Sequence, residues 1–235
     1  MTDALYSFRL FLSNTSISVV WSGLRTTLFI TAAGLFLGTL LASALCAASR
    51  SRWRLLRMIE QIYSVVIRGV PVLMLLLFLF YVAFARSGLS ALTVAVIAFA
   101  LNSAAHVDEI MKSALSAVDE GQVRAARTLG FSKWQAFCYV TLPQAATIAR
   151  PVYQSAVINT LQWTSVVGYI TISDLTRVIN QLGARASKPF FSLFLGMAID
   201  LFFWNFYGRF LSEDYEISEP YLSDYGAFLI RSASD

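Results

Sequence analysis

The sequence predicts an all-α integral membrane protein with about five transmembrane helices. Charged residues make up 14% of the chain and hydrophobic residues 57%, whereas soluble domains carry about 25% charged residues. Uncharged segments long enough to cross a hydrocarbon core of about 30 Å recur along the chain. Aromatic residues, which gather in spans and at membrane interfaces, make up 14%. The formal charge of +4 is modest and typical of loop charges that fix orientation, so nucleic acid is not an expected partner.

The first quarter of the chain predicts an interfacial helix followed by a span. Residues 1–25 mix polar and apolar side chains and favour a helix lying at the membrane interface, with Trp21 at headgroup level. Residues 26–49 contain no charge and form the first predicted span. The densest basic cluster of the chain comes next and predicts a cytoplasmic loop, hence an external N-terminus. This cluster consists of Arg50, Arg52, Arg54 and Arg57.

The second predicted span begins at residue 55 or 62 and ends at 84, and Gly69 and Pro71 interrupt it. Such a pair predicts a kink and a candidate hinge. Arg86-Ser87-Gly88 is expected to form an outer turn. The third span covers residues 90–111 and becomes polar toward its inner end. An unpaired charge at this depth costs about 2.5–3.5 kcal/mol. We therefore expect Arg68 to pair with Glu109, or with Asp108, and to fix the two spans together, a structural role and not a contact with the substrate.

The fourth predicted span, residues 145–172, is polar for a membrane helix and must face protein or water. Its polar side chains either line the path of a zwitterionic solute or form interhelical hydrogen bonds worth about 0.6 kcal/mol each. Trp163, in the outer third of this span, either stacks on a substrate or, in the more usual role, anchors the span at the interface. Residues 173–189 are expected to form an outer loop. The fifth span, residues 189–211, contains Asp200, which is a proton or cation site, a helix–helix contact or a neutral, protonated acid. An acidic tail, residues 212–235, is expected in the cytoplasm. The path candidates are Asn159, Gln162, Thr164 and Ser165.

A polar segment, residues 112–143, separates the third and fourth spans and is expected in the cytoplasm. Gly130 is predicted to end a short helix, Ser132 to cap the next, and Pro143 to close the segment. A short amphipathic helix between two spans cannot bury its own apolar face. It therefore requires a partner at the membrane surface.

Several absences in the sequence narrow the class of protein. The chain has no Walker A pattern, so transport against a gradient would draw energy from another chain or from an ion. Two cysteines and a single histidine form no metal-ligand pattern. Five helices are too few to enclose a wide path, which predicts a dimer with itself or with a sister subunit.

The polar segment resembles the "EAA…G…LP" motif of permease subunits of ATP-binding cassette importers. The matching residues are Arg124-Ala125-Ala126, then Gly130, then Leu142-Pro143. Its surroundings resemble the polar and basic amino-acid branch of glutamine or histidine type, with Arg68-Gly69-Val70-Pro71 similar to "RGTP" and Gly121-Gln122 similar to "GQ". The matches keep the order of the family and cover about residues 20–210.

The resemblance implies the type I importer permease fold, with a permease domain over residues 26–211. It implies that the motif helix is a coupling helix, which docks on cytoplasmic ATPase subunits that hold ATP and Mg, with no cofactor on this chain. An external solute-binding protein, a second permease and the lipid of a bacterial inner membrane are the other implied partners. Arg124 replaces the glutamate of the motif, so an ion pair made there would be reversed. The implied coupling residues are Gln122, Arg124, Ala125, Ala126, Gly130, Leu142 and Pro143.

Three other interpretations are considered. The same architecture carries other solutes, such as methionine or an oxyanion. A gradient-driven transporter or channel would use Asp200 and would leave the spacing of the polar segment unexplained. An intramembrane enzyme has little support, because the sequence contains neither a GxSxG nor an HExxH pattern.

Overall fold

The computed structural model describes residues 14–185, 196–198, 201–202 and 205, which contain helices and no strand. The chain divides into two units, Met1–Leu193 and Phe194–Asp235, and the bundle described below belongs to the first. In the second unit, the described residues are helical. Residues 1–13, the tail 212–235 and most of the expected fifth span, including Asp200, lie outside the described residues.

Two long helices, α2 (Asn14–Ser49) and α5 (Ala91–Ser116), form the centre of the bundle. Helix α2 is continuous through residue 26, where the sequence predicts the change from an interfacial helix to a span. At Gly34 and Gly38 the two backbones approach closely, because a Cβ atom added to Gly38 would lie 2.8 Å from Ser103 Cβ and 2.9 Å from Ala100 O. Small residues permit such contacts between helices in membranes.

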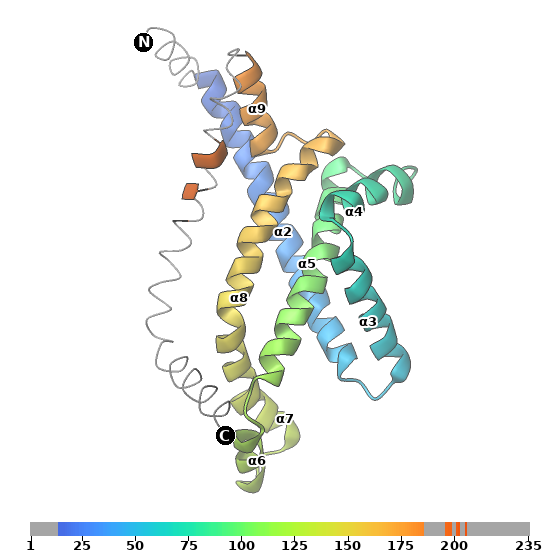
Figure 1. Cartoon of the computed structure of the whole chain (residues 1–235), viewed down its shortest axis with the longest axis vertical. Helices are drawn as coiled ribbons and strands as arrows, with labels where there is room; N and C mark the ends of the chain where they lie inside the picture. Colours follow the sequence, from blue (N-terminus) through green and yellow to red (C-terminus); the bar gives the residue numbers. More distant parts are fainter. Residues whose placement is uncertain (1–13, 186–195, 199–200, 203–204, 206–235) are drawn as a thin grey trace, which may run out of the picture. The chain divides into compact units, whose positions relative to one another are not determined.

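The second predicted span is broken into α3 (Arg54–Gly69), α4 (Val72–Phe78) and the π-helical turn η1 (Leu79–Ala83). The two parts meet at an angle of 106°, so the kink predicted at Gly69 and Pro71 is present and sharp. Val70 is extended, and Pro71 has no N–H with which to continue the helix. In the second part, Leu75 and Leu76 of α4 and Leu79 of η1 pack in a core with Phe99 of α5. The positions of α4 and α5 can be followed in Figure 1.

The predicted cytoplasmic segment contains α6 (Glu120–Thr128), α7 (Lys133–Ala136) and the π-helical turn η2 (Phe137–Thr141), and it leads into α8 (Leu142–Trp163). Gly130 makes the turn between α6 and α7 with φ of 94°, a conformation that favours glycine. Ser132 caps α7 in a capping box with Gln135. Pro143 lies in the first turn of α8, where a missing N–H is tolerated. Lys112 belongs to α5 and not to the polar segment.

The outer end differs from the sequence prediction. The α-helical part of the fourth span ends at Trp163 and continues as the 3₁₀ helix η3 (Thr164–Ile170), and the expected outer loop contains α9 (Leu175–Arg185). Buried Asp174 starts α9 by accepting hydrogen bonds from the N–H groups of Thr176 and Arg177, at 3.1 and 3.3 Å. Burial raises the pKa of the Asp174 carboxyl, and these N–H groups act in the opposite direction.

The described residues contain two helices long and apolar enough to cross a membrane, and a third span if α3 and the following helix are counted together. Helix α8 has 22 residues, enough for a span, yet it is too polar to meet the same criterion. Helices α6 and α7 lie at one end of this bundle and α9 at the other (Figure 1). The all-α fold class is confirmed.

We predict that Gly38→Leu lowers the thermal unfolding midpoint of the detergent-purified chain. The added side chain would collide with Ser103 and with the backbone of α5, and overpacking typically costs about 1–3 kcal/mol. The matched control is Ala32→Leu, because Ala32 is exposed on the same helix. Equal midpoints for the two variants would contradict the close α2–α5 contact.

Candidate functional site

A cavity of about 260 Å³ lies between α2, α3, α5 and α8. Its charged lining residues, among those that the structure describes, are Arg68 and Glu109. The remaining wall combines aliphatic side chains with polar and aromatic ones. The aliphatic residues are Leu35, Val107, Ile110, Val152 and Ala156. The polar and aromatic residues are Ser103, His106, Ser155, Asn159, Thr160 and Trp163.

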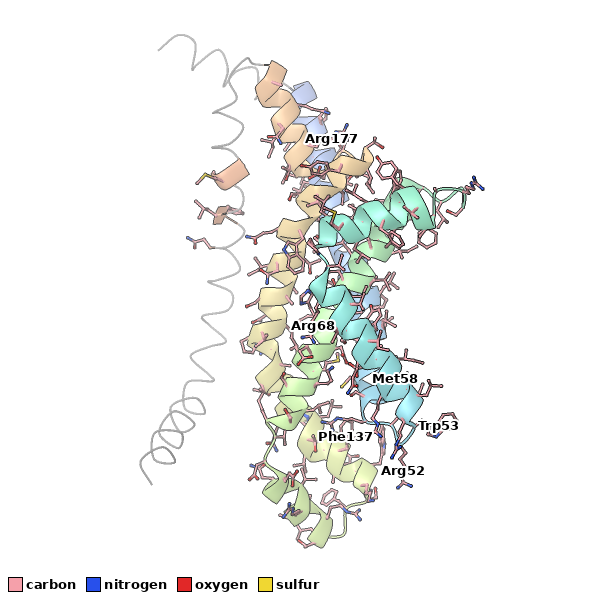
Figure 2. All side chains as sticks on the ribbon, turned by 45° about the vertical axis from the view of Figure 1, so that its right-hand side comes forward. Arg52, Trp53, Met58, Arg68, Phe137 and Arg177 are labelled. Atoms are coloured by element: carbon pink, nitrogen blue, oxygen red, sulfur yellow. The ribbon has the colours of Figure 1, made fainter. Side chains whose placement is uncertain are left out.

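Arg68 and Glu109 form the contact that the sequence predicts. Arg68 Nη2 lies 3.3 Å from Glu109 Oε2, and Arg68 Nε donates to the carbonyl oxygen of Ser64 at 3.2 Å. Arg68 occupies the last turn of α3, immediately before the break at Gly69, and lies between Arg52 and Arg177 along the bundle (Figure 2). Both side chains are partly exposed, so a solute in the cavity can reach either charge.

A second set of ionic contacts, which sequence reasoning missed, lies behind this pair. Lys112 Nζ lies 2.7 Å from Glu60 Oε1, 2.9 Å from Asp108 Oδ2 and 3.4 Å from Glu109 Oε2. The side chains of Glu60 and Asp108 are 3% and 0% exposed, and Ser64 Oγ lies within 3.2 Å of both carboxylates. The Lys112 cluster (Glu60, Ser64, Asp108, Glu109 and Lys112) therefore joins α3 to α5.

The sequence contains a signal for this cluster. Glu60 and Ser64 are four residues apart on one helix, and so are Asp108 and Lys112 on the other, which places each pair on one helix face. The described residues contain no group of three or more His, Cys, Asp or Glu side chains placed to hold a metal ion. The three carboxyl groups of the Lys112 cluster instead share the ammonium group of Lys112, and Arg68 supplies a second positive charge at Glu109.

His106 and Trp163 form the aromatic part of the wall. Their ring centroids are 5.3 Å apart with the planes inclined by 45°. The sequence alone favoured Trp163 as an interface anchor; the structure places it against His106 in the cavity lining. The aromatic contact joins the end of α8 to the middle of α5.

The predicted path residues do not all meet at this cavity. Asn159 lines it. Gln162 and Ser165 are exposed outside the lining, whereas Thr164 is buried and its hydroxyl donates to the carbonyl oxygen of Leu161 at 2.5 Å. Among these four, Asn159 is the residue that the geometry favours for contact with a solute.

The predicted coupling residues lie on α6 and at the start of α8. Arg124 pairs with Glu120 at 2.7 Å on the exposed surface of α6, a contact that the motif glutamate could not make. Gln144 Nε2 donates to Gln122 Oε1 at 2.7 Å, so α6 is joined directly to α8. Ala126 is buried and Ala125 exposed. Leu142 is exposed in the first turn of α8, next to Pro143.

Large apolar side chains remain exposed around this loop. Leu129 is 80% exposed, Trp134 72% and Tyr139 70%. These three residues and Gly130, here called the loop surface, belong to the segment from α6 to η2, and α6 and α7 lie at one end of the bundle (Figure 1). An exposed apolar patch of this kind indicates a protein or membrane contact.

A bundle of membrane helices around a cavity that an ion pair lines, with an exposed helical loop at one end, is the arrangement expected of a transport subunit. Residues 34–210 match the family model described as "Binding-protein-dependent transport system inner membrane component", and the chain belongs to this family. The resemblance to importer permeases is thereby confirmed, and the chain is a membrane protein.

Curated relatives carry names of the same kind. The chain is 36% identical over 182 residues to the probable amino-acid ABC transporter permease protein YckA of Bacillus subtilis, covering 77% of this chain and 80% of that protein. It is 30% identical over 185 residues to the histidine/lysine/arginine/ornithine transport system permease protein HisM of Salmonella typhimurium, covering 72% and 77% of the two chains.

Solved structures give the same fold. A chain of an amino acid ABC transporter crystallised with histidines aligns with a TM-score of 0.77 at 31% identity, covering 86% of this chain and 95% of that one. A chain of the MetNI methionine ABC transporter in an inward-facing conformation aligns with a TM-score of 0.67 at 17% identity, covering 85% and 97%. The fold is the type I importer permease fold.

We predict that Lys112→Met strongly destabilises the purified chain, because Glu60 and Asp108 would remain buried without a compensating charge. Removing one member of a buried ion pair typically costs about 3–5 kcal/mol. The control is Lys133→Met at an exposed position of α7. Adding Glu60→Gln and Asp108→Asn to Lys112→Met should restore much of the loss in a denaturant titration. A Lys112→Met chain as stable as the control would contradict the role of the cluster.

Proposed function

We propose that the chain is the membrane-spanning subunit of an ATP-driven importer that moves polar amino acids by alternating access. The observation that carries the proposal is the cavity whose two charged lining residues are Arg68 and Glu109. An amino acid presents the complementary pair, a carboxylate and an ammonium group on one carbon. The names of the relatives YckA and HisM support the same class of solute.

In the proposed complex, the solute carboxylate binds Arg68 and the solute ammonium binds Glu109. A guanidinium presents several donors in a planar fork that suits a carboxylate, and Glu109 is exposed enough to accept from an ammonium group. The carboxyl and ammonium groups of the solute then insert into the existing ion pair. Gly69 and Pro71, directly beyond Arg68, are the proposed hinge.

The energy source and partners complete the proposal. Cytoplasmic ATPase subunits, which hold ATP and Mg, dock on the loop surface and on α6, while an external binding protein delivers the solute to the opposite end. A second permease, identical or a sister, completes the path. The basic loop 50–53 and α6 lie toward the same end of the bundle (Figure 1), which supports a cytoplasmic location for this end. With five predicted spans, the proposed topology has the N-terminus outside and the C-terminus in the cytoplasm of a bacterium, with the chain in its inner membrane.

The other solutes considered from the sequence fit the cavity less well. An oxyanion would use Arg68 and would be repelled by Glu109. Methionine is itself an amino acid, so the ion pair does not discriminate against it. A gradient-driven transporter leaves the exposed apolar loop surface without a partner.

We predict that an ATPase subunit co-purifies with the tagged chain from detergent-solubilised membranes and is lost on Gly130→Val. Gly130 has φ of 94° with no atom near its missing Cβ, so valine changes the direction of α6 through backbone strain alone. Gly88→Val is the matched control, because Gly88 also has positive φ and lies in the predicted outer turn. Purification of the wild-type chain without an ATPase, with transport retained in liposomes, would refute the importer proposal.

We also predict that Arg68→Met weakens binding of radiolabelled L-glutamine to the reconstituted chain by about 10- to 100-fold, the range for loss of a charge-assisted hydrogen bond. Folding should persist because Glu109 is partly exposed and keeps its contact with Lys112, and a thermal unfolding curve checks this. Arg68→Lys should keep part of the affinity, and Arg57→Met, in the exposed basic cluster, should keep all of it. Unchanged binding by a folded Arg68→Met chain would exclude Arg68 from the solute site.

A further inference from the structure

We propose that the cavity selects amino acids whose side chain is polar and uncharged, and discriminates against both basic and acidic side chains. This inference rests on the proposed function and deepens it, since it concerns the solute side chain and not the carboxyl and ammonium groups. Its basis is the set of charged and hydrogen-bonding groups that line the cavity.

The carboxylate and ammonium groups common to all amino acids would pair with both charged residues of the lining. Among the described residues, the cavity wall contains one guanidinium, Arg68, and one carboxylate, Glu109. Once they bind the solute carboxylate and ammonium, no charged lining group remains to neutralise the side chain. A charged side chain would lose its water without a compensating ion, which is costly in a membrane-embedded site.

A basic side chain of the solute cannot form an ion pair with Glu60 or Asp108 of the Lys112 cluster. Glu60 and Asp108 are almost completely buried and do not line the cavity. Both contact Lys112, whose ammonium also lies 3.4 Å from Glu109. The nearest carboxylates beyond Glu109 are therefore covered and already in contact with Lys112, so a second cationic group in the cavity cannot contact them directly.

An acidic side chain of the solute lacks a cation in the described lining with which to pair. Its second carboxylate requires a second cation, yet Lys112 does not line the cavity and its ammonium contacts three carboxylates. His106 lines the wall, and its ring contacts Trp163. Arg68 remains the single arginine or lysine side chain in the described lining.

An uncharged polar side chain finds suitable groups. Ser155, Asn159 and Thr160 line the α8 side of the cavity. On the α5 side, Ser103 is 3% exposed, and its hydroxyl has no hydrogen-bond partner among the described residues. A buried hydroxyl without a partner is costly, and an amide or hydroxyl of a solute could satisfy it.

The size of the cavity agrees with this class of solute. At about 260 Å³ it lies just below the range of about 300–1,000 Å³ that is usual for drug-sized ligands. A single small amino acid therefore fits the space. The amide side chain of glutamine is the test case that combines this size with no charge.

The test is equilibrium binding of radiolabelled L-glutamine, L-lysine and L-glutamate to the chain in lipid nanodiscs, together with the ATPase subunits that co-purify with it. The external binding protein is omitted so that its own preference does not contribute. The wild-type complex should bind L-glutamine at least about tenfold more tightly than either charged amino acid, the difference between a neutral and a charge-assisted contact.

Two matched variants place a carboxylate inside and outside the cavity. Asn159→Asp adds one to the lining at an exposed position, and it should raise the affinity for L-lysine by about tenfold relative to L-glutamine. Gln162→Glu makes the same amide-to-acid change on the same helix, outside the lining, and should leave the preference unchanged. Ser155→Asp places a carboxylate at a second lining position, so the preference can still be tested if Asn159→Asp does not fold.

The outcomes separate the two proposals. Wild-type binding of L-lysine or L-glutamate as tight as that of L-glutamine overturns the inference on side-chain class and leaves the amino-acid site intact. Equal gains in L-lysine affinity for Asn159→Asp and Gln162→Glu also overturn it. Failure to bind any of the three amino acids overturns the proposed solute site itself, and the inference with it.

Discussion

The packing of α3 on α5 depends on buried ionic contacts between these two helices. Glu60 and Asp108 are nearly inaccessible, and an isolated carboxylate in such surroundings is very costly. Lys112 reaches both, so α3 can pack on α5 only in the register that brings these side chains together. That register also sets the position of Arg68, two turns beyond Glu60, beside Glu109. The positions of Arg68 and Glu109 in the cavity wall therefore depend on the contacts of Lys112 with Glu60 and Asp108, which do not line the cavity.

Sequence reasoning located the features that depend on local chemistry. The break at Gly69 and Pro71, the turn at Gly130 and the cap at Ser132 each follow from the conformational preferences of one or two residues. The Arg68–Glu109 contact could be inferred because few charges occur at that depth. The Lys112 cluster was missed because Lys112 was assigned to the loop that follows, although α5 extends to Ser116. Helix α9 was missed because its charges suggested a loop.

The lining of the cavity was harder to predict. A span with polar residues on several faces gives little indication of its rotation about its own axis, so the face that Asn159 presents could not be distinguished from that of Gln162. Trp163 shows the same limit, since a terminal aromatic serves equally well as an anchor or as part of a wall. The close contact of Gly38 with Ser103 fixes the rotation of α2 against α5, and it depends on the backbone approach of two helices distant in sequence.

Helix α8 joins the two ends of this arrangement. At its start, Gln144 is hydrogen-bonded to Gln122 of α6, and near its other end Asn159 and Trp163 line the cavity. The residues that would recognise a solute are thus separated by several helical turns from those beside the loop surface. On the proposed function, substitutions that alter cargo preference therefore need not disturb the attachment of an ATPase subunit. The same attachment could then serve chains that carry different solutes.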